Sequence, residues 1–263
     1  MVELEVVGGG KMGEALIGGL LQGGWATAEQ IRVVEPSAER RAQLADLFPG
    51  IGLAEAPQGA PGVILAVKPM QIAGVCKTLP SSGGLRVLSI AAGVTIETLE
   101  ANLPSGTAVV RAMPNTPALV GAGASAISGG SHVDVDDMDW ADGILSAVGI
   151  VVRVPEPLLD AVTGLSGSGP AYVFLIAEAL IDAGVLVGLP RDMARALAGQ
   201  TLLGAGKLLV ESSDDAATLR GAVTSPGGTT AAGIQVLEQA AVRAAMVDAV
   251  RASAARAAEL GRT

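Results

Sequence analysis

The feature that most constrains the fold is a short strand that runs into a glycine-rich loop and then a helix at the start of the chain. Residues 2–7 alternate apolar side chains with glutamates, and a helical apolar pattern follows over residues 14–21. Between them, Gly8, Gly10 and Gly13 have the spacing G-x-G-x-x-G. In this context the three glycines allow a tight turn, close approach of a pyrophosphate, and close packing of helix on strand. The segment predicts the first βα unit of a dinucleotide-binding domain.

Further apolar runs continue this alternation of strand and helix up to about Pro155. They span residues 31–34, 63–67, 86–90, 108–112 and 150–154. Nearly continuous apolar strands that alternate with helices are typical of a mostly parallel sheet covered on both faces. Ligands of such sheets bind outside the carboxyl ends of the strands. We therefore expect a doubly wound, Rossmann-like α/β domain over residues 1–156, with one cofactor site at its strand ends.

An acidic residue, Glu35, ends the second strand 22 residues beyond Gly13. An acid at this distance commonly binds the ribose hydroxyls of NAD and repels the 2′-phosphate of NADP. Glu35 therefore favours NADH. Two alternatives stay open: Arg40 and Arg41 follow closely and could hold a phosphate instead, and Glu35 could be a solvated charge at a strand end.

The second part of the chain, residues 157–263, has a purely helical pattern. Residues 170–188 form a predicted helix that is apolar almost all round, so it must be buried on every side. Residues 190–211 and 230–260 predict two more helices, which are too few to surround the first. We expect an all-α domain that a second subunit covers, giving an obligate dimer that can assemble further.

A second glycine-rich stretch, V-T-S-P-G-G-T-T at residues 223–230, precedes the last predicted helix. Its glycines let the backbone approach a ligand, and the helix start leaves several N–H groups free for a small carboxylate. The threonines add hydroxyl donors. An ordinary capped helix after a Pro-Gly turn explains the same residues on motif grounds alone.

Composition limits the classes of partner. The net charge of −9 argues against nucleic acid, and the longest uncharged region, residues 112–133, is interrupted by proline and glycine as no membrane helix would be. The one cysteine, Cys76, has no partner for an internal disulfide and reads as a buried core residue. We expect a cytoplasmic protein with no targeting segment and no metal site, and with neither nucleic acid nor a membrane as a partner. His132, the one histidine, is expected to be a surface loop residue.

The chain resembles the pyrroline-5-carboxylate reductase family over nearly its whole length. The resemblance rests on six stretches: GGGKMG at 8–13, VILAVKP at 63–69, SIAAGV at 89–94, RAMPNTPA at 111–118, SGSGPAY at 166–172 and VTSPGGTT at 223–230. It implies reduction of the cyclic imine 1-pyrroline-5-carboxylate to L-proline with NAD(P)H, the last step of proline biosynthesis. It also implies a homo-oligomer built through the C-terminal helices.

The resemblance, together with the strand ends, also assigns site residues. Those expected to bind the cofactor are Gly8, Gly10, Lys11, Met12, Gly13, Glu35, Ala66, Val67, Lys68, Pro69, Ala92, Gly93 and Asn115. Those expected to bind the substrate are Ser225, Gly227, Gly228, Thr229 and Thr230. The amides of Gly228 and Thr229 would hold the carboxylate, and the Thr230 hydroxyl would hydrogen-bond the ring nitrogen. Lys68 reads either as a cofactor contact or as a solvated strand end.

The chain departs from the family pattern in two places. Glu35-Pro36 stands where the family often has Asn-Arg or similar neutral and basic residues, and residues 53–61 lack the Asn and acidic residue common before the VILAVKP strand. Both departures concern the adenosine end of the cofactor.

Two other classes of protein fit parts of the sequence. A β-hydroxyacid dehydrogenase shares the glycine loop and helical second domain, but it needs a catalytic lysine on the first long helix, and residues 170–188 contain none. A redox-sensing nucleotide binder would not need the Gly-Gly-Thr-Thr stretch and usually adds a basic DNA-binding segment.

Overall fold

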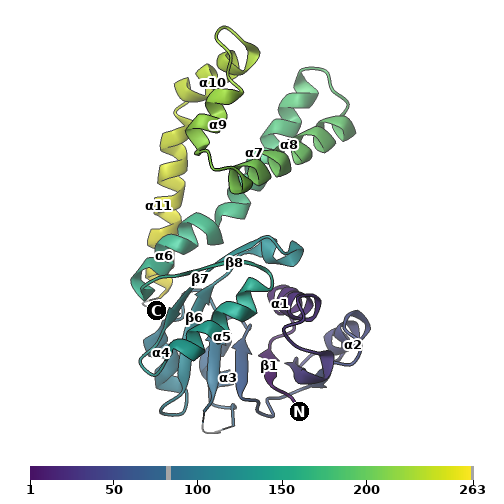
Figure 1. The fold of residues 1–263 in the computed structure, drawn as a ribbon, viewed down its shortest axis with the longest axis vertical. Helices are drawn as coiled ribbons and strands as arrows, with labels where there is room; N and C mark the ends of the chain where they lie inside the picture. Colours follow the sequence, from purple (N-terminus) through teal and green to yellow (C-terminus); the bar gives the residue numbers. More distant parts are fainter. Residues whose placement is uncertain (81–83, 262–263) are drawn as a thin grey trace. The chain divides into compact units, whose positions relative to one another are not determined.

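The computed structural model describes residues 1–80 and 84–261, and the chain divides into two compact units. The first unit is Met1–Ser168 with the described part of Val250–Thr263, and the second is Gly169–Ala249. Figure 1 traces the chain through both. The first unit is built on a β-sheet and the second is entirely helical in its regular structure.

The sheet of the first unit has eight strands in the order β3-β2-β1-β4-β5-β6-β7-β8. Neighbouring strands are parallel except for β6 and β7. The strands are β1 Leu4–Val7, β2 Ile31–Val34, β3 Gly52–Ala54, β4 Gly62–Leu65, β5 Arg86–Ser89, β6 Ala108–Met113, β7 Gly123–Gly129 and β8 Gly149–Arg153. Every predicted strand is present, with its ends shifted by at most two residues, so the doubly wound fold is confirmed.

Two strands, β3 and β7, were not predicted from the sequence. β3 is only three residues long and begins with a glycine. β7 has the sequence GASAISG, which lacks the run of large β-branched side chains that marks the other strands. It pairs antiparallel with β6, so that Arg111 lies opposite Ser128. Backbone pairing with β6 therefore stabilises a strand that the side chains of β7 do not predict.

Helices cover both faces of the sheet because successive strand residues point to opposite sides. On one face, α1 (Lys11–Gln22), α2 (Ala38–Leu47) and α5 (Val135–Ser146) pack on side chains such as Val6, Val33 and Ile64. On the other face, α3 (Ile72–Cys76) and α4 (Ile96–Asn102) pack on side chains such as Val7, Leu65 and Val87. Because β1, β2, β4, β5 and β6 are mutually parallel, their carboxyl ends lie at one edge of the sheet.

Cys76 ends α3 inside the second of these cores and is 1 % exposed. Burial raises the pKa of its thiol to about 11, so the thiol stays protonated near neutral pH. A protonated, enclosed thiol is a poor nucleophile, which agrees with its prediction as a core residue.

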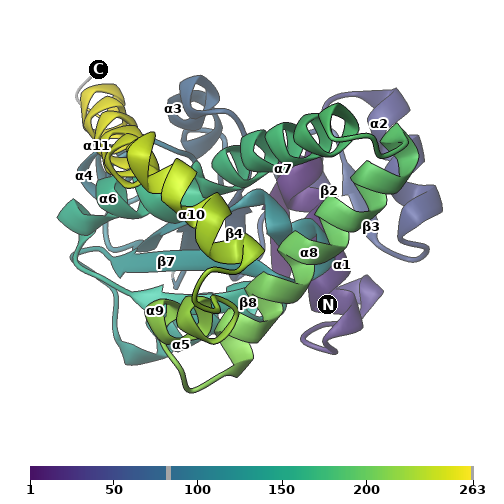
Figure 2. The same cartoon turned by 90° about the horizontal axis from the view of Figure 1, so that it is seen from above.

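The second unit is a set of helices: α7 Gly169–Leu186, α8 Arg191–Glu211, α9 Ala216–Ala222, α10 Thr229–Gln239 and the start of α11 Val242–Leu260. A short helix, α6 (Leu159–Val162), precedes them in the first unit. α7 and α8 form a hairpin of adjacent helices (Figures 1 and 2), closed by an ion pair of 2.7 Å between Asp182 and Arg191. Gly184 gives α8 room, since a Cβ there would lie 3.0 Å from Cβ of Ala194.

The apolar side chains of α7 are not covered within the single chain. Phe174 is 62 % exposed and Leu175 66 %, and large apolar residues of α8 such as Leu197 and Leu203 are also more than half exposed. The helical stretch Glu156–Leu186 is long and apolar enough to cross a membrane by length and composition alone. The prediction that helix 170–188 lacks cover of its own is therefore confirmed for the single chain.

The predicted single helix over residues 230–260 is wrong. The structure has two helices there, α10 and α11, separated at Ala240 and Ala241. Ala241 has φ 55°, the left-handed region, which is costly for a residue with a Cβ. Nothing in the sequence Gln-Ala-Ala-Val signals a break, because alanine is the strongest helix former.

Replacing Ala241 by glycine should stabilise the protein. Glycine removes a penalty of about 1–2 kcal/mol for the left-handed conformation but loses about 0.4–1 kcal/mol through a more flexible unfolded chain. We expect a net gain of about 0.5–1 kcal/mol in the free energy of unfolding, measured by denaturant titration at fixed protein concentration. The control is Ala240→Gly, because Ala240 has φ −78° and should lose stability. Equal destabilisation by both variants would contradict strain at Ala241.

Candidate active site

The glycine loop between β1 and α1 leaves no room for side chains at two of its three predicted glycines. Gly8 has φ 113°, and a Cβ there would lie 2.5 Å from the carbonyl oxygen of Ala66. A Cβ at Gly13 would overlap the carbonyl oxygen of Gly8. Above Gly10, in contrast, nothing lies within 4 Å of an added Cβ. The loop is therefore closed on the protein side and open at Gly10, which is the shape a pyrophosphate needs.

A fourth glycine, Gly9, is held from both sides, which the spacing did not predict. Its amide N–H donates to Oε2 of Glu35 (3.1 Å), and its carbonyl accepts from Nε of Arg40 (2.7 Å). A Cβ at this position would lie 2.6 Å from Leu44 Cδ1. The middle of the loop is thus fixed by α2 and by the end of β2.

Glu35 follows β2, and its carboxylate is oriented by backbone groups. Oε2 accepts from Gly9 and Oε1 accepts from the N–H of Ser37 (2.9 Å). The Glu35 N–H itself donates to Ala54 O of β3 (2.9 Å), which places Glu35 at the carboxyl edge of the sheet. A carboxylate held there beside the glycine loop suits the ribose hydroxyls of a dinucleotide.

A cleft of about 350 Å³ opens at the ends of β4, β5 and β6. Predicted cofactor residues line it: Met12, Ala66, Val67, Lys68, Pro69, Ala92 and Asn115. Met113, Pro114, Thr116 and Gly167 also line it, and these were not among the predicted contacts. Segments that are far apart in the sequence therefore meet at one strand edge, as the parallel sheet requires.

Asn115 lies in this cleft with both ends of its side-chain amide bound to protein. Nδ2 donates to the carbonyl of Ser166 (3.0 Å), and Oδ1 accepts from the N–H of Ala124 (2.9 Å). The residue is 8 % exposed. Its side chain ties the wall of the cleft together, so a contact with the cofactor through its backbone stays a prediction.

A single wide turn, Thr163–Gly167, forms another part of this wall. The Ser168 N–H donates to Thr163 O (2.8 Å), five residues back, and turns of this kind are frequent at functional sites. A Cβ on Gly167 would lie 2.6 Å from Cε of Met113, and one on Gly164 2.6 Å from the carbonyl of Val250 in α11. The small residues of this turn therefore have a steric cause.

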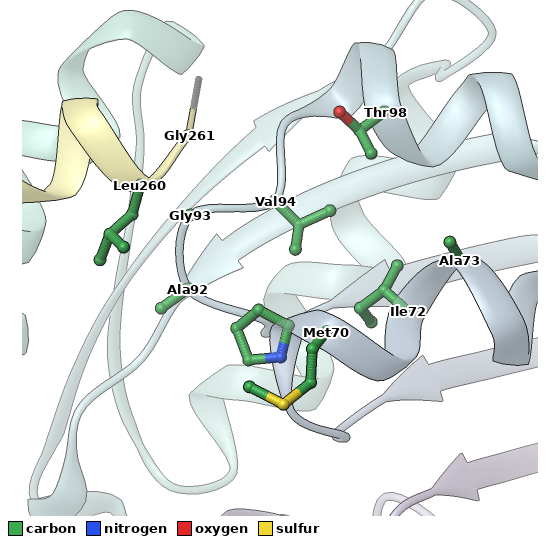
Figure 3. A pocket seen from close by; sticks show the side chains of 10 residues that line it. Met70, Ile72, Ala73, Ala92, Gly93, Val94, Thr98, Leu260 and Gly261 are labelled. Carbon is green, nitrogen blue, oxygen red and sulfur yellow. The ribbon is translucent and has the colours of Figure 1, made fainter. Parts of the chain in front are cut away.

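Gly93 does not line this cleft but a neighbouring pocket. This pocket has a volume of about 480 Å³ and is lined by Pro69, Met70, Ile72, Ala73, Ala92, Gly93, Val94, Thr98, Leu260 and Gly261 (Figure 3). Pro69 and Ala92 border both spaces. The loop after β5 thus separates an apolar pocket from the cleft, and Gly93 faces the former.

Lys11 and Lys68 are exposed at the same edge. Lys11 lies 3.6 Å from Glu14 on α1. The N–H of Lys68 donates to the side chain of Gln71 (3.2 Å) at the turn that follows β4. Lys11 would have to turn away from Glu14 to contact a bound phosphate, and the cofactor contacts of both lysines stay predictions.

The predicted substrate residues lie together in the second unit at the start of α10. Gly227 has φ 69°, Gly228 is the N-cap, and Thr229 and Thr230 begin the helix. The Gly228 N–H donates to Ser225 O (3.0 Å), and Gly228 has no space for a Cβ because the Ser225 side chain lies there. Across the described residues no side chain caps this helix, so its first N–H groups are available to an anion.

No acid–base pair accompanies these residues. His132 is exposed and lines a small pocket with Glu100 and Thr107, as expected of a surface loop residue. Within residues 1–80 and 84–261, no group of three His, Cys, Asp or Glu side chains could hold a metal ion. The start of α10 therefore offers backbone amides and threonine hydroxyls to a ligand.

Comparison with known proteins agrees with this arrangement. Two family models match the chain: NADP oxidoreductase, coenzyme F420-dependent, over residues 3–93, and pyrroline-5-carboxylate reductase dimerisation over residues 156–260. A pyrroline-5-carboxylate reductase of Synechocystis is 46 % identical, covering 99 % of both chains. One from Mycobacterium leprae is 40 % identical, covering 99 % of this chain and 97 % of the relative.

Solved structures give the same result. The pyrroline-5-carboxylate reductase of Coxiella burnetii matches with a TM-score of 0.93 and 38 % identity, covering 100 % of this chain and 99 % of the other. The Plasmodium falciparum enzyme with NADP bound matches with a TM-score of 0.87 and 30 % identity, covering 99 % and 98 %. The chain therefore belongs to the pyrroline-5-carboxylate reductase family.

Proposed function

We propose that this protein reduces the cyclic imine 1-pyrroline-5-carboxylate to L-proline with NAD(P)H, the last step of proline biosynthesis. The observation that carries this proposal is the 46 % identity with a reductase of this name over 99 % of both chains. The two alternatives from the sequence are disfavoured. Helix α7 contains no lysine to act on a hydroxyacid, and a redox sensor has no use for the Gly-Gly-Thr-Thr stretch at the start of α10.

The nucleotide would lie along the carboxyl edge of the sheet. The open side of Gly10 and the start of α1 would receive the pyrophosphate, and Glu35 the adenosine ribose. The cleft lined by Met12, Ala92 and Asn115 would take the nicotinamide end. When bound, the cofactor supplies a hydride to the imine carbon.

The substrate would be held at the start of α10. The amide of Thr229 at the start of α10 would bind its carboxylate, with a contribution of roughly 0.3–2 kcal/mol from the helix dipole. The amide of Gly228, which was also expected to do so, donates to Ser225 O instead (3.0 Å). A cyclic imine is basic enough to bind protonated, so its nitrogen already has the proton that it keeps in the product. Thr230 Oγ1 would accept a hydrogen bond from that N–H and fix the ring. Positioning, rather than a strong side-chain acid, would supply most of the acceleration.

Residues 1–156 would act as the nucleotide domain, and residues 157–263 as the substrate and dimerisation domain. The exposed apolar side chains of α7 and α8 support an obligate dimer in which a partner's helices cover them. We further propose that each active site combines a nucleotide domain with the 227–230 loop across the subunit interface. The single cysteine supports a cytoplasmic location, and nothing in the charge supports nucleic acid as a partner.

Wild-type protein should turn over 1-pyrroline-5-carboxylate, with kcat/KM for NADH equal to or above that for NADPH. The physical reason is repulsion between the Glu35 carboxylate and a 2′-phosphate. Steady-state rates with both reductants at matched salt give the comparison. Absence of turnover with either reductant would contradict the function. A tenfold preference for NADPH would contradict only the proposed role of Glu35 and would leave the proposed function standing.

Thr230→Val should lower kcat by ~10²–10⁴, the range typical of positioned groups that handle a proton. Valine has nearly the same shape but lacks the hydroxyl. Cofactor affinity, measured by fluorescence titration, should be unchanged. Thr78→Val is the control, since its hydroxyl only bonds Val75 O at the end of α3. Undiminished turnover of Thr230→Val would rule out the assignment.

Leu180→Glu should dissociate or unfold the dimer and abolish activity. Leu180 is 45 % exposed on α7 in the single chain, and a buried unpaired carboxylate at an interface is strongly destabilising. Leu47→Glu is the matched control, because Leu47 is 53 % exposed on α2 of the first unit. Sedimentation velocity with parallel activity assays measures both. A well-folded, fully active monomer would show that the site is not shared.

A further inference from the structure

Two arginines lie beside the glycine loop, and either could in principle recognise a 2′-phosphate. The structure gives both of them other partners. We infer that Arg40 is a positioning residue that fixes the glycine loop for any dinucleotide, and that it is not a ligand of the 2′-phosphate of NADPH. This inference rests on the proposed dinucleotide binding at Gly8–Gly13 and deepens it.

The Arg40 guanidinium is bound at each of its three nitrogens. Nε donates to Gly9 O (2.7 Å), Nη1 to Gln43 Oε1 (3.0 Å), and Nη2 to Oε2 of Glu14. The side chains of Arg40 and Glu14 are 21 % and 20 % exposed, so this pair is largely removed from solvent. Arg40 holds the pKa of Glu14 below its ordinary value, mainly through this hydrogen bond. The three acceptors are reached from three separate nitrogens of one planar group, and the single nitrogen of a lysine does not reproduce this geometry.

Gly9 is the point on which these contacts converge. Arg40 holds its carbonyl and Glu35 its N–H, while Glu14 lies on α1, the helix that the loop begins. Arg40 therefore links α2 to both the loop and the first turn of α1. Loss of this link would free the peptide plane next to Gly10, where the pyrophosphate is expected, and would weaken all dinucleotides alike.

Among the described residues, Arg41 is bound through one nitrogen only. Its Nη1 donates to the carbonyls of Glu35 (2.6 Å) and Pro36 (2.8 Å). A 2′-phosphate that took Arg40 as its ligand would have to displace it from Gly9 and Glu14, and would still meet the Glu35 carboxylate. Selectivity against the phosphate thus has two sources: the negative charge of Glu35 and the binding of Arg40 to protein groups.

Calorimetric titration of the full-length protein with NADH and with NADPH tests this inference. We expect Arg40→Gln to weaken both nucleotides by about tenfold or more, the loss typical of a hydrogen bond to a charged group, with their Kd ratio unchanged within about twofold. Arg40→Lys should behave like Arg40→Gln, because it keeps the charge but not the fork. Glu39→Gln, an exposed change on the same helix, is the control and should leave both Kd values unaltered.

Glu14→Gln separates the two roles of Arg40 most sharply. If Arg40 positions the loop, breaking its pair with Glu14 weakens NADH and NADPH together. If Arg40 were a phosphate ligand, releasing it from Glu14 would strengthen NADPH selectively, and Arg40→Gln would weaken NADPH selectively; either result overturns the inference. Thermal unfolding of the apo variants shows whether each is folded. If Arg40→Gln does not fold, Glu14→Gln decides the outcome. Wild-type protein that binds neither nucleotide would instead contradict the proposed function.

Discussion

The structure depends on the close contact between the first helix and the loop that precedes it. Gly8 touches the end of β4 at Ala66, and Gly13 touches Gly8, so that α1 begins directly against the sheet. This contact places the free N–H groups of α1 at the same edge as the ends of β4, β5 and β6. A side chain at either glycine would push the helix away and open the site. This steric constraint fixes where α1 begins relative to the residues that follow β4.

Strands of the sheet were predictable where burial dictates their composition. β1, β2, β4, β5, β6 and β8 carry runs of Val, Ile and Leu because most are buried on both faces. β7 was not, because its alanines, serines and glycines match a loop as well as a strand. The break between α10 and α11 at Ala241 was not predictable either, because the local sequence favours the wrong structure. Local propensity favours a continuous helix there, and tertiary context overrides it.

The site was predictable to a similar degree. Its glycines and strand ends follow from spacing along the chain. The structure gathers Met12 and the strand-end residues Ala66, Val67, Lys68, Pro69, Ala92 and Asn115 at one cleft, which the predicted glycines do not line. The residues that support the site do not follow from spacing. Arg40 reaches Gly9 across 31 positions, and Asn115 reaches Ser166 across 51. Such pairs connect segments that are close only in the folded chain. The small residues within 164–169 indicate a tight contact in the sequence, but they do not indicate which residues make it.

The exposed helix α7 requires a cover, and its charges decide between a bilayer and a protein. Glu178 and Asp182 lie in the middle of the helix, between apolar turns. Placing a carboxylate at the centre of a bilayer costs roughly 2.5–3.5 kcal/mol, so two of them would remove most of the gain from burying the apolar residues in lipid. At a protein interface the same carboxylates can pair, as Asp182 does with Arg191. Self-association through residues 156–260, the region that the dimerisation family model matches, fits the apolar side chains of α7 better than a bilayer does, while Asp182 is already paired within the chain.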